Sequence, residues 1–350
     1  MMATPSEFEL ARIVVQGGVD DHAFPAAAVS VGNASGPLWE EAFGRLTYDA
    51  AAPACTSATV FDLASLTKVI AAATIAMRLV EQRGLVLDAR VSGILPEWRA
   101  GDKAAITVRH LLDHSSGLPA HHRIWTEASG RDEYRRSIAA LALERAPGTS
   151  SVYSDPGFIT LGFVLEELGG APLDRQFADL FALWPGPLQF LPPDEWRDQI
   201  APTEFDPWRG RLIRGEVHDE NAAALGGVAA HAGLFGTAAA IGEFARLVLR
   251  TFQEPTRLGY PATMRLFATK TGVPGSSRAL AWDTALPTSS SGTRMSPRAI
   301  GHTGFVGTSL WIDPERDLYA VLLTNRVHPT RANEKLLPLR ARFHDALPGG

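Results

Sequence analysis

Cysteine and lysine are both scarce in this sequence. A single cysteine, Cys55, among 350 residues excludes an internal disulfide framework and a cysteine-ligated metal site. Only four of the 33 basic residues are lysines. The formal net charge of −5 leaves no basic footprint, which argues against nucleic acid as the main partner. Because lysines are so few and a charge in an apolar setting is costly unless it is paired, a lysine in such a setting needs a chemical explanation.

Long apolar runs and several common motifs are missing as well. No stretch reaches about 18 uninterrupted apolar residues, so we expect no membrane span. The first residues contain no basic start followed by an apolar run, so we expect no secretory signal and a cytoplasmic location. A Gly-x-Ser-x-Gly elbow, a Walker A loop and a dinucleotide fingerprint are absent, which argues against an α/β-hydrolase and against nucleotide binding.

The stretch from Phe61 to Val80 is the most unusual part of the chain. From Val69 onwards only Thr74 and Arg78 are polar, so a helix here has no solvent face. A helix that is apolar nearly all round belongs in the interior of a sizeable protein. The sequence therefore predicts a buried central helix.

Ser65 and Lys68 stand at the first turn of this helix, three residues apart and therefore on one face. A serine hydroxyl is a poor nucleophile until a base takes its proton. A neutral lysine one turn away can act as that base if burial lowers its pKa. The pair therefore indicates a catalytic serine, although the two-residue pattern alone is weak.

Strands are predicted near both ends of the chain, and the middle is helical and rich in loops. The expected strands cover residues 26–33, 38–47, 299–304, 308–313 and 318–325. Helices are expected over 131–144, 156–168 and 330–344, and a weak strand over 278–283. The segment 184–220 has no clear period, so no structure is assigned to it.

This order predicts an α/β (α+β) fold. Both chain termini form one antiparallel sheet that is flanked by helices, and a mostly α-helical domain is inserted between them. We expect a discontinuous sheet domain of residues 1–84 and 236–350 and a helical domain of residues 85–235. The active site is expected in the cleft between the two domains.

Two further motifs strengthen the catalytic interpretation. Tyr153-Ser-Asp155 follows a Pro-Gly loop and precedes a predicted helix. His302-Thr-Gly304 lies on a predicted strand and is followed by Phe305-Val-Gly307, where glycine permits close backbone approach.

Taken in this order, Ser-x-x-Lys, Tyr-x-Asp and His-Thr-Gly resemble the serine β-lactamase and penicillin-binding-protein superfamily. The resemblance is to its class C branch, with the related family VIII carboxylesterases, and it spans nearly the whole chain. The segments that carry it are Phe24-Pro25, Asp62–Lys68, His110–Leu118, Gly226–Phe235 and Gly301–Thr308.

The resemblance implies roles for individual residues. Ser65 would be the acylated nucleophile, with Lys68 and Tyr153 sharing the general-base and general-acid work. The backbone N–H groups of Ser65 and Phe305 would form the oxyanion hole, and Thr303 would line the strand that holds the substrate. No metal or organic cofactor is implied.

Two departures from the family pattern bear on the substrate. β-Lactamases of this branch carry Lys-Thr-Gly, whereas this chain has His302 before Thr303 and Gly304. Histidine is largely neutral near pH 7 and lysine is a cation, so this change weakens the case for carboxylate-bearing β-lactams. Asp155 replaces an asparagine, so it can accept from Lys68 and hold it protonated, which would shift the base role towards Tyr153. His231 lies in a glycine-rich stretch that we expect near the cleft, either as a structural residue or as a substrate contact.

Three functions remain open at this point. The first is a serine hydrolase acting on small esters through an acyl-enzyme, with weak or no β-lactamase activity. The second is an amidase or peptidase acting on cell-wall muropeptide fragments. The third is a catalytically inactive binding protein on the same scaffold, against which the intact Ser65, Lys68 and Tyr153 argue. The expected partner is thus a small ester or amide; the sequence does not determine the oligomeric state.

Overall fold

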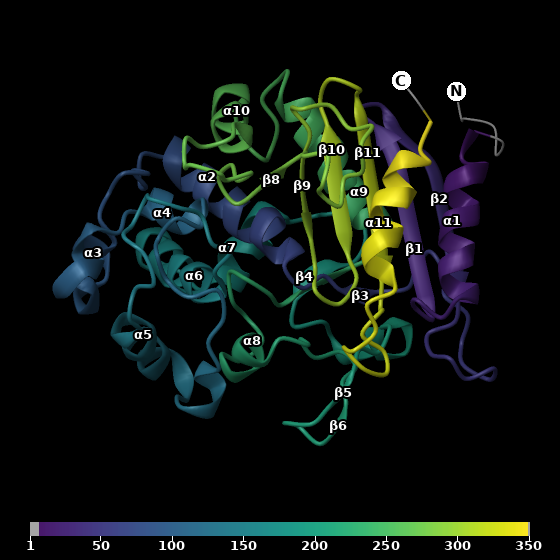
Figure 1. Ribbon diagram of the computed structural model, residues 1–350, viewed down its shortest axis with the longest axis horizontal. Helices are drawn as coiled ribbons and strands as arrows, with labels where there is room; N and C mark the ends of the chain where they lie inside the picture. Colours follow the sequence, from purple (N-terminus) through teal and green to yellow (C-terminus); the bar gives the residue numbers. More distant parts are fainter. Residues whose placement is uncertain (1–6, 349–350) are drawn as a thin grey trace.

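The computed structural model of the protein describes residues 7–348. Its largest sheet has six antiparallel strands in the order β2-β1-β11-β10-β9-β8. These strands are β1 (Ala26–Asn33), β2 (Gly36–Gly44), β8 (Asp283–Thr284), β9 (Ile300–Thr303), β10 (Ser309–Asp313) and β11 (Leu318–Thr324). Because β1 pairs with β11, strands from both ends of the chain form one sheet, as predicted (Figure 1).

The helices lie before, between and after these strands. The longer ones are α1 (Glu9–Asp20), α2 (Ala73–Glu81), α5 (Gly130–Ala140), α6 (Asp155–Gly169), α7 (Leu173–Leu180), α9 (Ala238–Thr251), α10 (Pro261–Ala268) and α11 (Leu336–Asp345). The shorter ones are the π-helix η2 (Lys68–Ala72), α3 (Val91–Ile94), α4 (Val108–Leu112), α8 (Glu220–Ala224) and the 3₁₀ helices Pro96–Trp98, Gly101–Ala105, Ile124–Thr126 and Asp194–Gln199.

Helices cover both faces of the six-stranded sheet. α1 and α11 pack side by side on one face, and α9 packs on the other against β1 and β11 (Figure 1). Successive side chains of a strand point to opposite faces. In β1, Ala27, Val29 and Val31 accordingly belong to the apolar core beneath α1 and α11, whereas Ala26 and Ala28 belong to the larger core on the other side.

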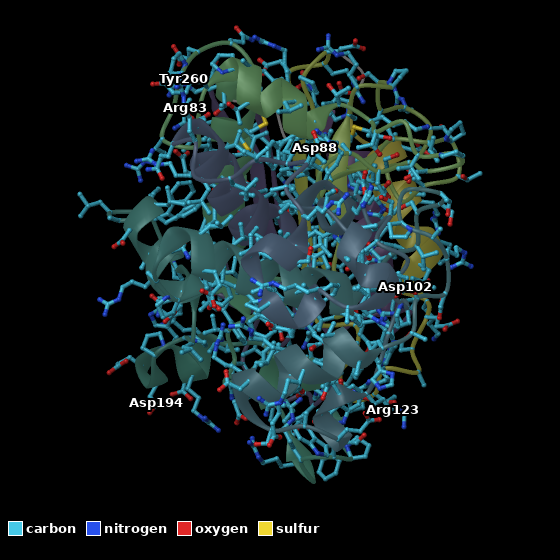
Figure 2. The ribbon with its side chains drawn as sticks, turned by 90° about the vertical axis from the view of Figure 1, so that its left-hand side faces the viewer. Arg83, Asp88, Asp102, Arg123, Asp194 and Tyr260 are labelled. Atoms are coloured by element: carbon cyan, nitrogen blue, oxygen red, sulfur yellow. The ribbon has the colours of Figure 1, made fainter. Side chains whose placement is uncertain are left out.

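The helices between residues 73 and 224 gather at one side of the sheet, which is the left of Figure 1 and the side facing the viewer in Figure 2. The most deeply buried is α6, the helix predicted over 156–168, in which all residues from Asp155 to Leu165 are buried. The Ser154 side chain caps its start by accepting from the Gly157 N–H at 3.1 Å. Its end is set by Gly170, which has a left-handed φ of 68°.

A second, three-stranded sheet joins segments that are distant in the sequence. β7 (Leu234–Gly236) lies between β3 (Phe61–Asp62) and β4 (Leu188–Phe190). β4 belongs to the segment 184–220, for which no structure was predicted; this segment also contains the hairpin of β5 (Phe205–Asp206) and β6 (Arg211–Leu212), at the bottom of Figure 1. The division into two domains at residues 84/85 and 235/236 stays a prediction.

Several predicted boundaries were wrong. The helix expected over 131–144 ends at Ala140, and the strand expected over 38–47 covers Gly36–Gly44. The last helix was expected from residue 330 but begins at Leu336. The carbonyl groups of Arg331 and Asn333 instead accept from the buried guanidinium of Arg326 at 3.3 and 2.6 Å, so they serve a loop. The weak strand expected over 278–283 shrinks to β8, Asp283–Thr284. Within residues 7–348, no helix combines the length and the apolar character needed to cross a bilayer.

Candidate active site

Ser65 lies in a tight turn between β3 and the buried helix. The preceding Ala64 has a φ of +46°, a left-handed conformation that costs a non-glycine residue about 1–3 kcal/mol. Asp62 holds this turn, because its carboxylate accepts the N–H of Ala64 and the N–H of His218, both at 2.7 Å. The turn leaves the Ser65 side chain on the wall of a large cavity.

Lys68 opens a one-turn π-helix rather than continuing a regular α-helix. Single π-helical turns often occur at functional sites. The Lys68 side chain is fully buried, and its ammonium has three acceptors. It donates to Ser65 Oγ at 3.0 Å, to Asp155 Oδ1 at 2.8 Å and to the His231 carbonyl at 3.2 Å. All three N–H groups of the buried cation are therefore satisfied.

Tyr153 approaches Ser65 from the start of α6. Its hydroxyl donates to Ser65 Oγ at 2.7 Å. Its ring lies between two histidine rings, with centroid distances of 4.6 Å to His114 and 5.7 Å to His302. The Lys68 ammonium lies 4.6 Å from the centre of the same ring. The structure thus brings Ser65, Lys68 and Tyr153 into one hydrogen-bonded group.

The charges of this group follow from burial and pairing. Burial lowers the pKa of Lys68, but the Asp155 carboxylate and the Tyr153 oxygen outweigh it, so the pKa lies above its ordinary value. Burial raises the pKa of Asp155, but Lys68 and a hydrogen bond from His121 bring it below its ordinary value. Burial raises the pKa of Tyr153 against the effect of Lys68. At neutral pH the group therefore holds an ammonium, a carboxylate and a neutral phenol.

The strand β9 supplies the opposite wall of the cavity. His302 is buried and donates Nδ1–H to the Thr303 carbonyl at 2.8 Å. Burial, with the nearby charges of Arg278 and Lys68, lowers the pKa of His302 well below its ordinary value, so the ring is neutral as expected from the sequence. In the part of the chain that the structure describes, the backbone N–H groups of Ser65 and Phe305 have no hydrogen-bond partner.

The cavity has a volume of about 1210 Å³. Its lining includes the predicted residues Ser65, Tyr153, Asp155, His302, Thr303, Gly304 and Phe305. His231 is not on its surface: the side chain is buried and bonds Asp219 Oδ1 at 2.7 Å, and only its carbonyl reaches the group, through Lys68. Among residues 7–348, no group of three or more His, Cys, Asp or Glu side chains is arranged to hold a metal ion.

Several lining residues were missed by sequence reasoning. Arg278 reaches the site from a loop, with its guanidinium 5.2 Å from the centre of the Tyr153 ring and only a loose 3.9 Å contact to Asp283. His121 bonds the second oxygen of Asp155 at 2.9 Å. Arg123, labelled in Figure 2, lines the cavity from the helical side. These residues stand outside any motif, so no sequence pattern indicates them.

Comparison with known proteins agrees with this geometry. The sequence matches the Beta-lactamase family over residues 11–344. The chain belongs to the beta-lactamase family. The predicted resemblance is confirmed, and the protein is a hydrolase of the serine β-lactamase and penicillin-binding-protein type.

Two relatives of this family member have names that concern the cell wall. An N-acetylmuramyl-L-alanine amidase of Bacillus subtilis (strain 168) is 34% identical over 308 residues, covering 77% of this chain and 68% of that protein. A protein described as a candidate D-alanyl-D-alanine carboxypeptidase of Escherichia coli (strain K12) is 29% identical over 319 residues, covering 81% of this chain and 73% of that protein.

Solved structures share the fold over almost the full length. EstCE1, a hydrolase with promiscuous acyltransferase activity, has a TM-score of 0.78 and 22% identity, covering 98% of this chain and 99% of its own. A penicillin-binding-protein homologue from Caulobacter crescentus has a TM-score of 0.77 and 20% identity, covering 99% and 98%. At these identities the likeness concerns the fold alone, and it confirms the predicted fold class.

Proposed function

We propose that this protein hydrolyses its substrate through an acyl-enzyme on Ser65. The observation that carries the proposal is the position of Ser65 Oγ, 2.7 Å from the Tyr153 hydroxyl and 3.0 Å from the Lys68 ammonium on a cavity wall. A nucleophile within hydrogen-bond reach of a base, itself oriented by further groups, is the arrangement that nucleophilic catalysis requires. The N–H groups of Ser65 and Phe305, which have no hydrogen-bond partner within residues 7–348, are the proposed oxyanion donors.

In the proposed reaction, Tyr153 acts as the base in its phenolate form, the minor form at neutral pH, which arises when the phenol loses its proton to solvent. Ser65 Oγ forms a bond to the carbonyl carbon while its proton passes to the Tyr153 oxygen, and the carbonyl electrons collect on the oxyanion. Collapse of this intermediate expels the amine or alcohol, which takes the proton from Tyr153. Water then repeats the sequence to release the acid. Lys68 is held as an ammonium by Asp155 and stabilises the phenolate.

We propose an amide of a carboxylate-bearing cell-wall fragment as the first candidate substrate. The names of the amidase and carboxypeptidase relatives support this class. Arg278 supports it independently, since its guanidinium faces the Tyr153 ring with only a loose carboxylate contact. An arginine in this state is suited to a carboxylate, so it supplies the cation that neutral His302 does not. This order reverses the one favoured by the sequence alone.

A small ester is the second candidate. The buried, neutral His302 favours it, because this β9 residue offers no positive charge to a substrate carboxylate. An ester also has a better leaving group than an amide, so it demands less proton donation from Tyr153. Both candidates use the same acyl-enzyme.

A fluorophosphonate probe followed by peptide mass spectrometry tests the nucleophile. We expect one adduct, on Ser65, which disappears in Ser65→Ala. Ser116→Ala is the matched control, because Ser116 is a buried serine outside the cavity lining. An intact protein that forms no adduct on Ser65 would refute the acyl-enzyme proposal and leave the binding-protein alternative.

Arg278→Met separates the two substrate classes. Assays would compare a muropeptide or acyl-dipeptide bearing a free carboxylate with an uncharged aryl ester. We expect the variant to raise KM for the carboxylate substrate by about tenfold to hundredfold, the worth of a charge-assisted hydrogen bond, and to leave KM for the ester nearly unchanged. Equal effects on both substrates, or none, would contradict the assigned role of Arg278.

A further inference from the structure

Arg340 is a buried cation with no carboxylate partner among the described residues. It lies on α11, is 6% exposed, and takes part in no ion pair within residues 7–348. Its Nη2 donates instead to two backbone carbonyls, Gly304 O at 2.7 Å and Thr308 O at 3.1 Å. Burying a charge without an opposite charge is expensive. An apolar side chain of similar size would fill this site at lower cost, so the charge itself needs an explanation.

The first of these carbonyls belongs to the same peptide unit as the proposed oxyanion donor. Gly304 C=O and Phe305 N–H are the two ends of one planar trans peptide, so they point in opposite directions. A donor that fixes the carbonyl therefore also fixes the direction of the N–H. Arg340 approaches the carbonyl end, and the Phe305 N–H has no hydrogen-bond partner among the described residues.

The loop needs such a restraint because its backbone is otherwise permissive. Gly304 and Gly307 bracket a turn in which the Gly307 N–H donates to Gly304 O at 3.1 Å. Gly307 has a left-handed φ of 122°, and glycine adopts such conformations without a steric penalty. A Cβ at residue 304 would lie 2.8 Å from the Leu63 carbonyl and 3.1 Å from Ala64 Cβ. Glycine is therefore required to bring the loop against the Ser65 turn, and side-chain packing at this residue cannot hold the peptide in place.

We propose that Arg340 is a positioning residue of the oxyanion hole, which aims the Phe305 N–H at the oxyanion and polarises it through the Gly304 carbonyl. This inference rests on the proposed function. A cation at the carbonyl draws electrons along the amide and strengthens its N–H as a donor, because hydrogen bonds in a chain polarise one another. The bond from Thr308 Oγ1 to the Leu63 carbonyl at 3.0 Å connects the same loop to the nucleophile turn.

The kinetic test compares Arg340→Lys and Arg340→Met with Arg342→Met, an exposed arginine on the same helix. Each variant is assayed with an aryl ester and with the corresponding thionoester, in which sulfur replaces the carbonyl oxygen. Sulfur is a weak acceptor, so an oxyanion hole favours the ester. In the two Arg340 variants we expect kcat for the ester to fall about tenfold to hundredfold, with KM nearly unchanged. This loss is somewhat smaller than the one that follows removal of an oxyanion donor. The thionoester rate should change little, so the ester-to-thionoester ratio falls.

Two results would overturn the inference. An equal loss for both substrates in a folded variant would mean that Arg340 serves only general stability. Rates equal to those of Arg342→Met would mean that it serves no catalytic purpose. Arg340→Lys keeps the charge but not the planar fork, and serves as the informative variant if Arg340→Met fails to fold.

A second readout does not require turnover, so it separates failure of this inference from failure of the proposed function. The amide resonance of Phe305 is compared by NMR in the wild type, Arg340→Lys and Arg342→Met. We expect it to shift or broaden in Arg340→Lys alone, because the Gly304 carbonyl loses the guanidinium donor and keeps only the Gly307 N–H. An unchanged resonance would refute the positioning role. A wild type with no Ser65 adduct but the expected resonance change would refute only the proposed function.

Discussion

Asp155 sets the protonation state of the residues around Ser65. Its carboxylate bonds the Lys68 ammonium at 2.8 Å and His121 Nδ1 at 2.9 Å, so one acidic side chain connects the buried site to an exposed histidine. Its charge raises the pKa of Lys68 and also that of Tyr153. Either possible base is therefore kept in its protonated form by the same carboxylate. Where the family pattern has an asparagine amide, this chain has the Asp155 carboxylate, and its charge shifts the pKa values of Lys68 and Tyr153.

Asp155→Asn should move the acid limb of the pH profile of kcat/KM to lower pH. A base must be deprotonated to act, and the Asp155 charge raises the pKa of both candidates, so its removal lowers both pKa values. A larger share of the enzyme is then active at neutral pH. The measurement is kcat/KM for an aryl ester between pH 5 and pH 10, and an acid limb that stays in place or moves to higher pH would contradict this assignment. Glu254→Gln, an exposed site far along the chain, is the control.

The sequence allowed the reacting residues to be predicted but not their electrostatic surroundings. Ser65, Lys68 and Tyr153 fall in short motifs whose spacing carries chemistry, and the structure brings all three within hydrogen-bond reach. Arg278 and Arg340 lie far away in the chain and reach the site only through the fold. A single charged residue in a loop or on a helix has no local signal, so these two could not be found from the sequence.

At the level of elements, the central stretch differs from the single helix that its apolar pattern predicts. Phe61 and Asp62 form a strand, Ala64 and Ser65 form a turn, and the regular helix α2 begins only at Ala73 after a π-helical turn. Apolar side chains are compatible with all of these states when every face is buried. The periodicity therefore predicted burial correctly. The turn, however, depends on two hydrogen bonds that the Asp62 carboxylate accepts, one from the neighbouring Ala64 N–H and one from the N–H of His218, which is distant in the sequence.

Packing of α9 against the sheet gives a test at this scale. Replacing a helical glycine by alanine normally stabilises by up to about 1 kcal/mol. At Gly242, however, a Cβ would meet Ser30 Oγ, with Ser30 Cβ at 3.1 Å and Tyr319 Cε2 at 3.3 Å. Overpacking costs about 1–3 kcal/mol, so Gly242→Ala should lower the free energy of unfolding.

The control for this substitution is Gly17→Ala on α1, where a Cβ would meet nothing within 4 Å. This variant should be neutral or more stable, because only helix propensity acts. Urea unfolding of both variants measures the difference. A higher free energy of unfolding for Gly242→Ala would mean that α9 leaves room for a Cβ between Gly242 and the Ser30 side chain.

For the whole molecule, the sheet made from both chain ends was predictable, but the connections that hold the remote segments to it were not. Glu204, in the segment for which no structure was predicted, is buried and bonds three groups. Its carboxylate accepts from Arg331 N at 2.9 Å and Arg331 Nε at 2.6 Å, and it bonds His218 Nε2 at 2.8 Å. It thereby connects the loop before α11 to the loop that Asp62 holds beside Ser65.

This connection should make stability depend on pH. Burial raises the pKa of Glu204, but the hydrogen bonds from His218 and Arg331 lower it to about 2, from an ordinary value of 4.5. A depressed folded-state pKa stabilises the protein above pH 4.5, and the contribution is lost as the pH falls from there to about 2. This contribution to the free energy of unfolding is about 3 kcal/mol.

Glu204→Gln should therefore be less stable than the wild type at pH 7 by about that amount, and the difference should shrink as the pH falls through 4.5 towards 2. Urea unfolding at a series of pH values measures it, and taking the difference between the two proteins removes the contribution of the other carboxyl groups. Glu254→Gln, at an exposed position, should stay within about 0.5 kcal/mol of the wild type throughout. If the difference in the free energy of unfolding between the wild type and Glu204→Gln does not vary with pH, packing of the side chain, and not the charge of Glu204, holds the two loops together.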